Sequence, residues 1–321
     1  MRRQEEVITQ LQSREIEEAP AAVDQHVFLI GRPPISEFLG FVKCMAVDGQ
    51  ARSQAVLVEA WRQANDHVKR LEQAEAGIAD NVETAPLPAE LDLARLRLER
   101  EPLFRASTQC TPVEIAIVEL DKLVVFQKNI DLAHIANIRA RLPRKPTPQQ
   151  IFDLCLPSEP ERPGVRMMQI APNSFTFVSP SNDFRFLQTQ VLGPEQLGQS
   201  IQNGHATDVI GLAFGFSANY LTAISLERRL VLGNGSHRAY ALREHGVTHA
   251  PCLVQRFSRR EELELAPVGL QQHPDRCLRD ARPPILKDYL DPALRMIVPV
   301  VRKHRLIKLT FGVEAVDIPA A

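Results

Sequence analysis

Six consecutive residues in the last third of the chain combine the groups that a phosphate-binding turn needs. They are Gly233-Asn234-Gly235-Ser236-His237-Arg238. The glycines let the backbone adopt left-handed conformations and approach a ligand closely. Ser236 falls at or near the start of a following helix, where unpaired amides and the helix dipole favour an anion. Arg238 can hold phosphate oxygens through two hydrogen bonds, and His237 can add a further donor. The turn therefore predicts phosphate binding.

A purely structural role fits the same residues. Many helices begin after a glycine turn, and a capped turn with Arg238 on the surface needs no ligand. Both interpretations stay open on the turn alone. In either case Ser236 is expected to cap or donate rather than act as a nucleophile. The neighbouring His237 would point about 100° away on the helix and could not deprotonate it.

The segments around the turn predict an α/β unit. Apolar, β-rich runs alternate with a helical segment that Gly246 should end. Strands are expected at 113–118, 220–226, 229–232 and 250–255, and helices at 130–141 and 236–245.

The string Leu230-Val231-Leu232-Gly233-Asn234-Gly235-Ser236-His237-Arg238-Ala239-Tyr240-Ala241-Leu242 resembles the Gly-x-His-Arg or Gly-x-x-Arg box of the ParB/sulfiredoxin superfamily. Residues 113–131 resemble the opening strand of that superfamily and the stretch that follows it. The resemblance covers roughly residues 112–256, with an unusual insertion near 143–215. It implies a mixed α/β domain that binds a nucleoside triphosphate with Mg²⁺ and supports phosphoryl transfer or nucleotide hydrolysis.

Departures from the superfamily narrow this expectation. Sulfiredoxins carry their reactive cysteine where this chain has Ser236, so sulfur transfer is not expected. The Glu-Asn-x-Gln-Arg box of partition-type ParB proteins is missing, and no helix-turn-helix pattern follows residue 256. The feature that this chain still shares with all branches of the superfamily is the phosphate-binding turn at 233–238.

Two further groups of residues extend the candidate site. Gln127, Lys128 and Asp131 match the region where the superfamily places substrate-facing groups. Lys128 could neutralise phosphate and Asp131 could act as base or metal ligand, although such residues before a helix also serve as caps. The loop at 177–185 could bind a nucleoside sugar through groups such as Arg185, or Mg²⁺ through Asp183. A serine or Asx turn explains that loop equally well.

Composition limits the class of protein. The 321 residues are 44% hydrophobic and 24% charged with a net charge of −1, so no overall field draws the chain to nucleic acid or lipid. No run approaches the ~20 apolar residues of a membrane span, and the start of the chain lacks a signal-peptide pattern. The five cysteines form no Cys-x-x-Cys pair, and the histidines form no metal-ligand spacing. We therefore expect a cytoplasmic protein with reduced thiols and no membrane partner.

The whole chain is predicted to be an α+β protein in three parts. Residues 1–110 are predicted to form a mostly helical region, with helices at 53–76 and 89–100. Residues 111–256 are predicted to form the ParB/sulfiredoxin-like domain, and residues 257–321 a C-terminal extension. The tripeptide Arg-Pro-Pro occurs at 32–34 and again at 282–284, and a basic, strand-like segment spans 300–309.

The leading functional hypothesis is a nucleotide or phosphate-ester binding protein in which Asp183 or Asp131 handles metal or proton. One alternative is a DNA-associated module of the ParB-like partition or nuclease type. Another is a non-catalytic interaction protein that keeps only the fold.

Overall fold

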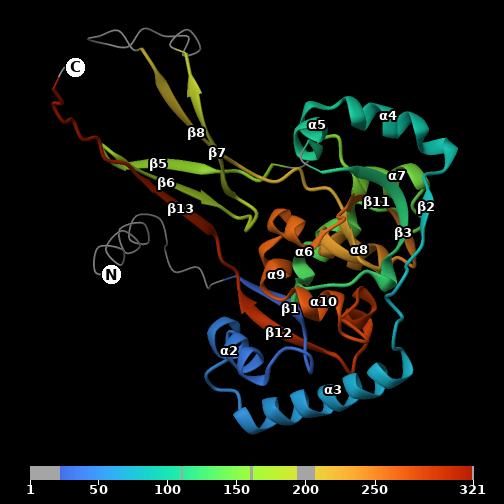
Figure 1. Ribbon diagram of the computed structural model, residues 1–321. Coiled ribbons are helices and arrows are strands. Elements are labelled where there is room, and N and C mark those ends of the chain that lie inside the picture. The colour runs from blue at the N-terminus through green and yellow to red at the C-terminus, as the bar shows by residue number, and fades with distance from the viewer. Residues whose placement is uncertain (1–21, 110, 160–161, 194–206, 320–321) are drawn as a thin grey trace.

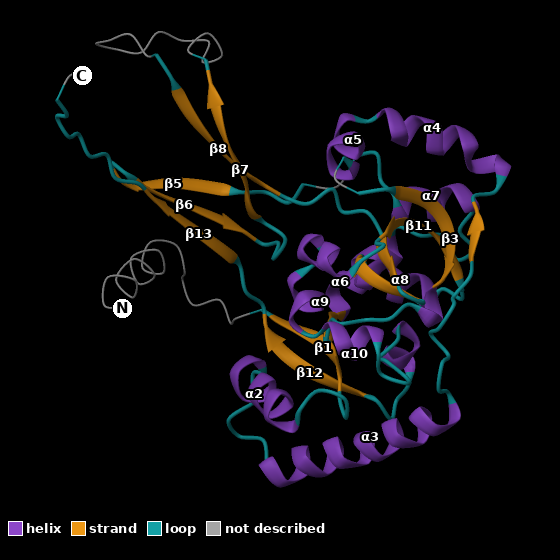
Figure 2. Cartoon of the chain, in the orientation of Figure 1, coloured by secondary structure: helices purple, strands orange, loops and turns teal. Residues whose placement is uncertain are grey.

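The computed structural model describes residues 22–109, 111–159, 162–193 and 207–319. It is an α+β structure with four separate sheets, and its helices gather around two of them (Figures 1 and 2). Within these residues no helix combines the length and apolar character that crossing a membrane requires.

A five-stranded mixed sheet carries the predicted α/β unit. Its strand order is β10-β9-β11-β3-β2, with β11 antiparallel to β3 and parallel to β9. This arrangement confirms the four strands and the helix expected around the glycine turn. The strands are β2 (Thr84–Pro86), β3 (Val113–Glu119), β9 (Thr222–Leu226), β10 (Arg229–Asn234) and β11 (His249–Arg256).

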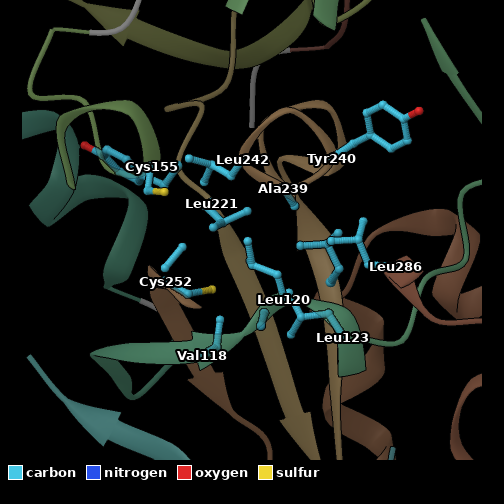
Figure 3. Close-up of a cluster of buried hydrophobic side chains, with 14 of the residues drawn as sticks. Val118, Leu120, Leu123, Cys155, Leu221, Ala239, Tyr240, Leu242, Cys252 and Leu286 are labelled. Carbon is cyan, nitrogen blue, oxygen red and sulfur yellow. The ribbon is translucent and has the colours of Figure 1, made fainter. Parts of the chain in front are cut away.

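Three helices contribute buried side chains to the same hydrophobic core as this sheet. They are α6 (Leu132–Ala140), α7 (Pro148–Cys155) and α8 (Ser236–Glu244), where α7 lies on β11 and α6 on α8. Figure 3 shows part of the core between them, with Leu242 of α8 above Val118 and Cys252 of the sheet. Burial alternates along the apolar run of β3 and is continuous along most of β11, as expected for strands whose faces lie against a core.

A second sheet joins segments that are far apart in the sequence. Its order is β12-β1-β4, with Val23 opposite Val301 and His26 opposite Asp131. One strand from each of the three predicted parts meets here, so the first part contributes a strand beside its helices and the last part pairs with the first. The strands are β1 (Val23–Leu29), β4 (Asn129–Asp131) and β12 (Arg295–Val301).

Helices of the first part surround these sheets. Phe28 of β1 packs with Phe38 and Val42 of α2 and with Leu57 of α3 in a compact apolar cluster. The amphipathic pattern predicted helices at 53–76 and 89–100, and both are confirmed within a few residues. The elements are α2 (Ile35–Met45), α3 (Gln54–Ala74), η1 (Ala89–Leu91), α4 (Asp92–Arg100) and α5 (Pro102–Thr108).

The segment predicted as an insertion, 143–215, divides into two parts. Its helix α7 belongs to the main core, whereas its strands extend away from the main body (Figure 1). We call these strands together with β13 the β-arm: β13-β6-β5 form one sheet and β7-β8 a separate hairpin. The predicted basic strand at 300–309 is instead split between β12 and β13. The strands are β5 (Arg166–Ala171), β6 (Ser174–Ser179), β7 (Arg185–Leu192), β8 (Val209–Gly215) and β13 (Arg305–Thr310).

Four short helices lie between β11 and β12 in the sequence, and a fifth, η2, lies between β3 and β4. They bring Arg276 and Arg282 toward the loop that follows β1, through hydrogen bonds described below. These elements are η2 (Leu120–Lys122), η4 (Arg260–Leu265), α9 (Val268–Gln272), α10 (Pro274–Leu278) and η5 (Leu286–Leu290).

Candidate anion-binding site

The glycine turn connects β10 to α8, as the sequence predicts. Gly235 has a φ of +95°, which confirms the left-handed conformation expected for this glycine. A Cβ atom there would lie 2.7 Å from Cδ1 of Leu221, so a side chain would also clash. Gly235 occupies the cap position, and Ser236 is the first helical residue and is buried. Sequence reasoning therefore placed the cap one residue too late.

Arg238 is buried rather than exposed, and its guanidinium binds protein oxygens. Nη1 donates to the carbonyl oxygens of Asn219, of Leu154 at 3.3 Å and of Cys155 at 3.2 Å, while Nη2 donates to Oδ1 of Asn219 at 2.8 Å. Burial lowers the pKa of Arg238 to about 10, so the group stays charged at neutral pH. These bonds tie α8 to the end of α7 and hold Asn219 at a positive φ of 56°. Neither the two hydrogen bonds to phosphate nor the surface position considered for Arg238 is found, because its side chain turns inward to carbonyl groups at the end of α7 and at Asn219.

His237 also contacts protein rather than open space. Its Nε2 atom accepts a hydrogen bond from the backbone N–H of Asp131 at 3.1 Å, and its ring meets that of His134 edge-on at 5.0 Å. Burial, with smaller contributions from His134 and His26, lowers the pKa of His237 to about 3. The ring is therefore neutral, and Nε2 cannot donate to a phosphate.

Asp131 caps the helix that follows it. Its Oδ1 atom accepts from the backbone N–H groups of Ala133 at 2.8 Å and His134 at 3.4 Å. The sequence left capping open as an alternative to a role as base or metal ligand, and the geometry is that of a cap.

Asp183 and Arg185 lie at the base of the β-arm and pair with each other. Oδ2 of Asp183 accepts from the backbone N–H of Ser217 at 2.8 Å and from its hydroxyl at 2.7 Å, and Oδ1 accepts from Arg185. The hydroxyl of Ser181 accepts from the N–H of Asp183, which is the serine turn considered as the alternative. In the part of the chain that the structure describes, no three His, Cys, Asp or Glu side chains are grouped to hold a metal ion.

Gln127 and Lys128 line a cavity of about 150 Å³ at the end of β1, to which residues of α3, α9 and α10 also contribute. Three cationic side chains border it, together with the carboxylates of Glu72 and Asp280. The cations are Arg32, Lys128 and Arg276. Two of the residues that sequence reasoning assigned to a phosphate site therefore lie together, although away from Arg238.

Arg32 has the most unusual environment in this cavity. Its side chain is only 10% exposed, and its Nη1 atom donates to the carbonyl oxygen of Arg282 at 2.7 Å. The Nε and Nη2 atoms are buried and have no hydrogen-bond partner among the described residues. The nearest carboxylate oxygen, of Asp288, lies 3.7 Å from Nε, which is too far for a hydrogen bond. Nε and Nη2 form the edge of a guanidinium that binds two oxygens of one phosphate or carboxylate group.

The other two cations lie close to Arg32 and to each other. Arg276 donates from Nη2 to the carbonyl oxygen of Arg32 at 2.7 Å. Lys128 forms an ion pair with Glu37, and burial, together with the positive charge of Arg276, lowers the pKa of Lys128. The carboxylates of Glu37, Glu72 and Asp280 offset part of this positive charge, so the case for an anion rests on the free edge of the Arg32 guanidinium rather than on net charge.

The repeated Arg-Pro-Pro tripeptide marks this site in the sequence. Pro33 and Pro284, one from each copy, both line the cavity. Arg282 is fully buried, but its charge is met by Asp288 at 2.5 Å and Glu75 at 2.9 Å. The two copies of the tripeptide thus differ: all three guanidinium nitrogens of Arg282 donate hydrogen bonds, whereas Arg32 has ion pairs with Glu72 at 3.8 Å and Asp288 at 3.7 Å but no hydrogen bond from Nε or Nη2. Sequence reasoning missed Arg32 and Arg276, and the repeat was the available signal for Arg32.

Comparison with known proteins adds no relative: no protein-family model, no curated protein and no solved structure matches this chain. Similarity to the ParB/sulfiredoxin superfamily therefore stays a prediction.

Proposed function

We propose that the protein binds a small phosphate-bearing molecule, a nucleotide or another phosphate ester, in the cavity that Arg32, Lys128 and Arg276 border. The unpaired Nε and Nη2 atoms of Arg32 carry this proposal. A buried donor without a partner costs about 1–3 kcal/mol, and more when it is charged. A phosphate group that meets both atoms would remove that cost.

The size of the cavity favours the phosphate end of a ligand. Pockets for drug-sized ligands measure roughly 300–1,000 Å³, whereas this one measures about 150 Å³. The phosphate would lie inside, and the rest of a nucleotide would extend outward. Gln127 and Asn65 are polar neighbours that can contact ester or sugar oxygens.

In this proposal the glycine turn does not contact the ligand but helps to position Lys128 through the neighbouring strand β4. His237 holds the backbone of Asp131, and Asp131 ends β4, the strand that begins directly after Lys128. Phosphoryl transfer or nucleotide hydrolysis through Asp131 or Asp183, with Mg²⁺, stays a prediction, because both carboxylates are engaged by protein groups.

A calorimetric and thermal-shift panel tests the proposal. The ligands are inorganic phosphate, pyrophosphate and nucleoside mono-, di- and triphosphates, each with and without Mg²⁺. A ligand at one hundred times its Kd should stabilise the fold by about 2.7 kcal/mol.

Matched lysine variants locate the binding. Lys128→Met should weaken binding by roughly 10- to 100-fold, the range for a hydrogen bond to a charged group. Lys122→Met is the control, because Lys122 is equally exposed and pairs with Glu119 at 2.8 Å. The proposal fails if no ligand binds, or if binding survives both Lys128→Met and Arg32→Met unchanged.

A DNA-associated role stays a second prediction. Retention on double-stranded DNA that falls steeply with added salt would support it over the small-molecule site.

A further inference from the structure

The β7–β8 hairpin of the β-arm has an apolar face that no described element covers. Val191 and Ile210 lie opposite each other in the pairing and are 70% and 71% exposed. Leu212, two residues further along β8, lies on the same face and is also exposed. The base of the hairpin is held by the ring of Phe214, which stacks on Phe177 of β6 at 4.4 Å. The outer half has no such support.

This hairpin also has open edges. Its sheet contains only β7 and β8, so the outer backbone groups of both strands face no further strand among the described residues. A two-stranded hairpin alone in water is marginally stable, and exposed edges readily pair with another strand. The hairpin is therefore suited to accept one more strand.

The segment 311–319, which we call the tail, has the complementary properties. It follows β13 and extends beyond the β5–β6 strands, away from the main body (Figure 1). Beyond Phe311 it forms no hydrogen bond to another described residue. Val316 and Ile318 are 73% and 83% exposed, and as alternate residues they share one face of an extended chain.

The charges of the tail and the β-arm are opposite in sign. The described strands and turns of the β-arm carry four cations and two carboxylates. The tail carries Glu314 and Asp317 and no basic residue. A strand supplied by the tail would therefore bring a matching apolar face to the hairpin and an opposite charge to the β-arm as a whole, since Arg185 and Asp208 of the hairpin cancel each other.

We propose that two copies of this chain associate by exchanging tails, with the tail of each copy adding as a strand to the β7–β8 hairpin of the other. In the structure the tail does not pair with its own hairpin. A two-fold arrangement satisfies both hairpins and both tails at once and closes the assembly as a dimer. Backbone hydrogen bonds supply affinity, and Val316 and Ile318 supply the side-chain match. The inference does not depend on the ligand of the Arg32 cavity.

Sedimentation velocity on the full chain between about 1 and 100 µM tests the exchange. Wild type should be a dimer that dissociates on dilution. The tail variant is Val316→Asp/Ile318→Asp and the hairpin variant is Val191→Asp/Ile210→Asp. Each should raise the dissociation constant of the dimer by about 100-fold or more, a factor of about ten for each of its two tail–hairpin contacts. The control, Val56→Asp/Leu93→Asp, changes equally exposed residues outside the β-arm and should leave the dimer unchanged.

A mixing experiment separates tail exchange from other dimers. The tail variant keeps an intact hairpin and the hairpin variant keeps an intact tail. Their mixture should therefore form a heterodimer with one contact, weaker than wild type but tighter than either variant alone.

Three outcomes would overturn the proposal. One is a wild type that stays monomeric at 100 µM, and another is a dimer that neither double variant weakens. The third is a monomer whose hairpin amides resist hydrogen exchange only while its own tail is intact, since that result places the tail on its own hairpin.

Discussion

Replacing Arg238 should destabilise the fold strongly, although the sequence around it is typical of a ligand site. Arg238→Met keeps much of the side-chain volume but removes the charge and four hydrogen bonds. The carbonyl oxygen of Cys155 retains a second donor, the N–H of Leu221, so it stays satisfied. The carbonyl oxygen of Leu154 and the two acceptors of Asn219 have no other hydrogen bond among those described, but Asn219 is exposed and Leu154 half-buried, so water can replace part of each lost bond. At about 1 kcal/mol for each of these three acceptors, the expected loss is roughly 2–4 kcal/mol.

Urea unfolding followed by circular dichroism measures this loss as a shift in the midpoint at constant slope. Arg139→Met is the matched control, because Arg139 is half exposed and its ion pair with Glu244 should contribute no more than about 1 kcal/mol. A loss below 1 kcal/mol for Arg238→Met, together with weaker phosphate binding, would refute the structural role and return Arg238 to the ligand site.

Two further predictions concern the same turn. Because burial lowers the pKa of His237 from 6.5 to about 3, the unfolded chain takes up a proton that the folded chain excludes. The free energy of unfolding should therefore fall by roughly 1.4 kcal/mol per pH unit below about pH 6.5. Measured by urea unfolding between pH 5 and pH 7, it should depend less steeply on pH in His237→Gln than in wild type. The same pH dependence in both proteins would contradict the buried neutral ring. Gly235→Ala should lower the stability of the fold by about 1–3 kcal/mol, more than Gly246→Ala does. Both glycines have a positive φ, but only at Gly235 would an added Cβ atom meet a neighbouring side chain. Equal losses of stability in thermal unfolding would argue against the clash with Leu221.

Local features of the fold could be predicted from the sequence. The strand, turn, helix and strand between residues 222 and 256 form as expected. Glycines that end an element and the spacing of apolar residues are local signals, so a few residues are enough to predict these elements. The left-handed Gly235 followed from the same local reasoning. The one-residue error at Ser236 is typical of helix ends, where a glycine in a left-handed conformation can take the cap position itself.

Features that depend on distant segments could not be predicted. Arg238 is buried because the end of α7 and the backbone at Asn219 bring carbonyl groups to it, and its own neighbours in sequence do not reveal this. The Arg32 cavity needs residues near 128, 276 and 284 to converge on one loop. The family resemblance singled out Gln127 and Lys128, which line this cavity, whereas Arg276 carried no sequence signal.

The pairing of β1 with β12 has a consequence for how the chain is made. Val23 lies opposite Val301, so β1 leaves the ribosome long before its partner is translated. At typical synthesis rates of about 5–20 residues per second, that delay is roughly 15–55 s. The five-stranded sheet can assemble once residue 256 has emerged, but Arg32 cannot reach Arg282 until later. During this interval the edge of β1 that later pairs with β12 is open, and an open strand edge is prone to pair with other chains. Occupancy of the Arg32 cavity would then distinguish finished molecules from nascent ones.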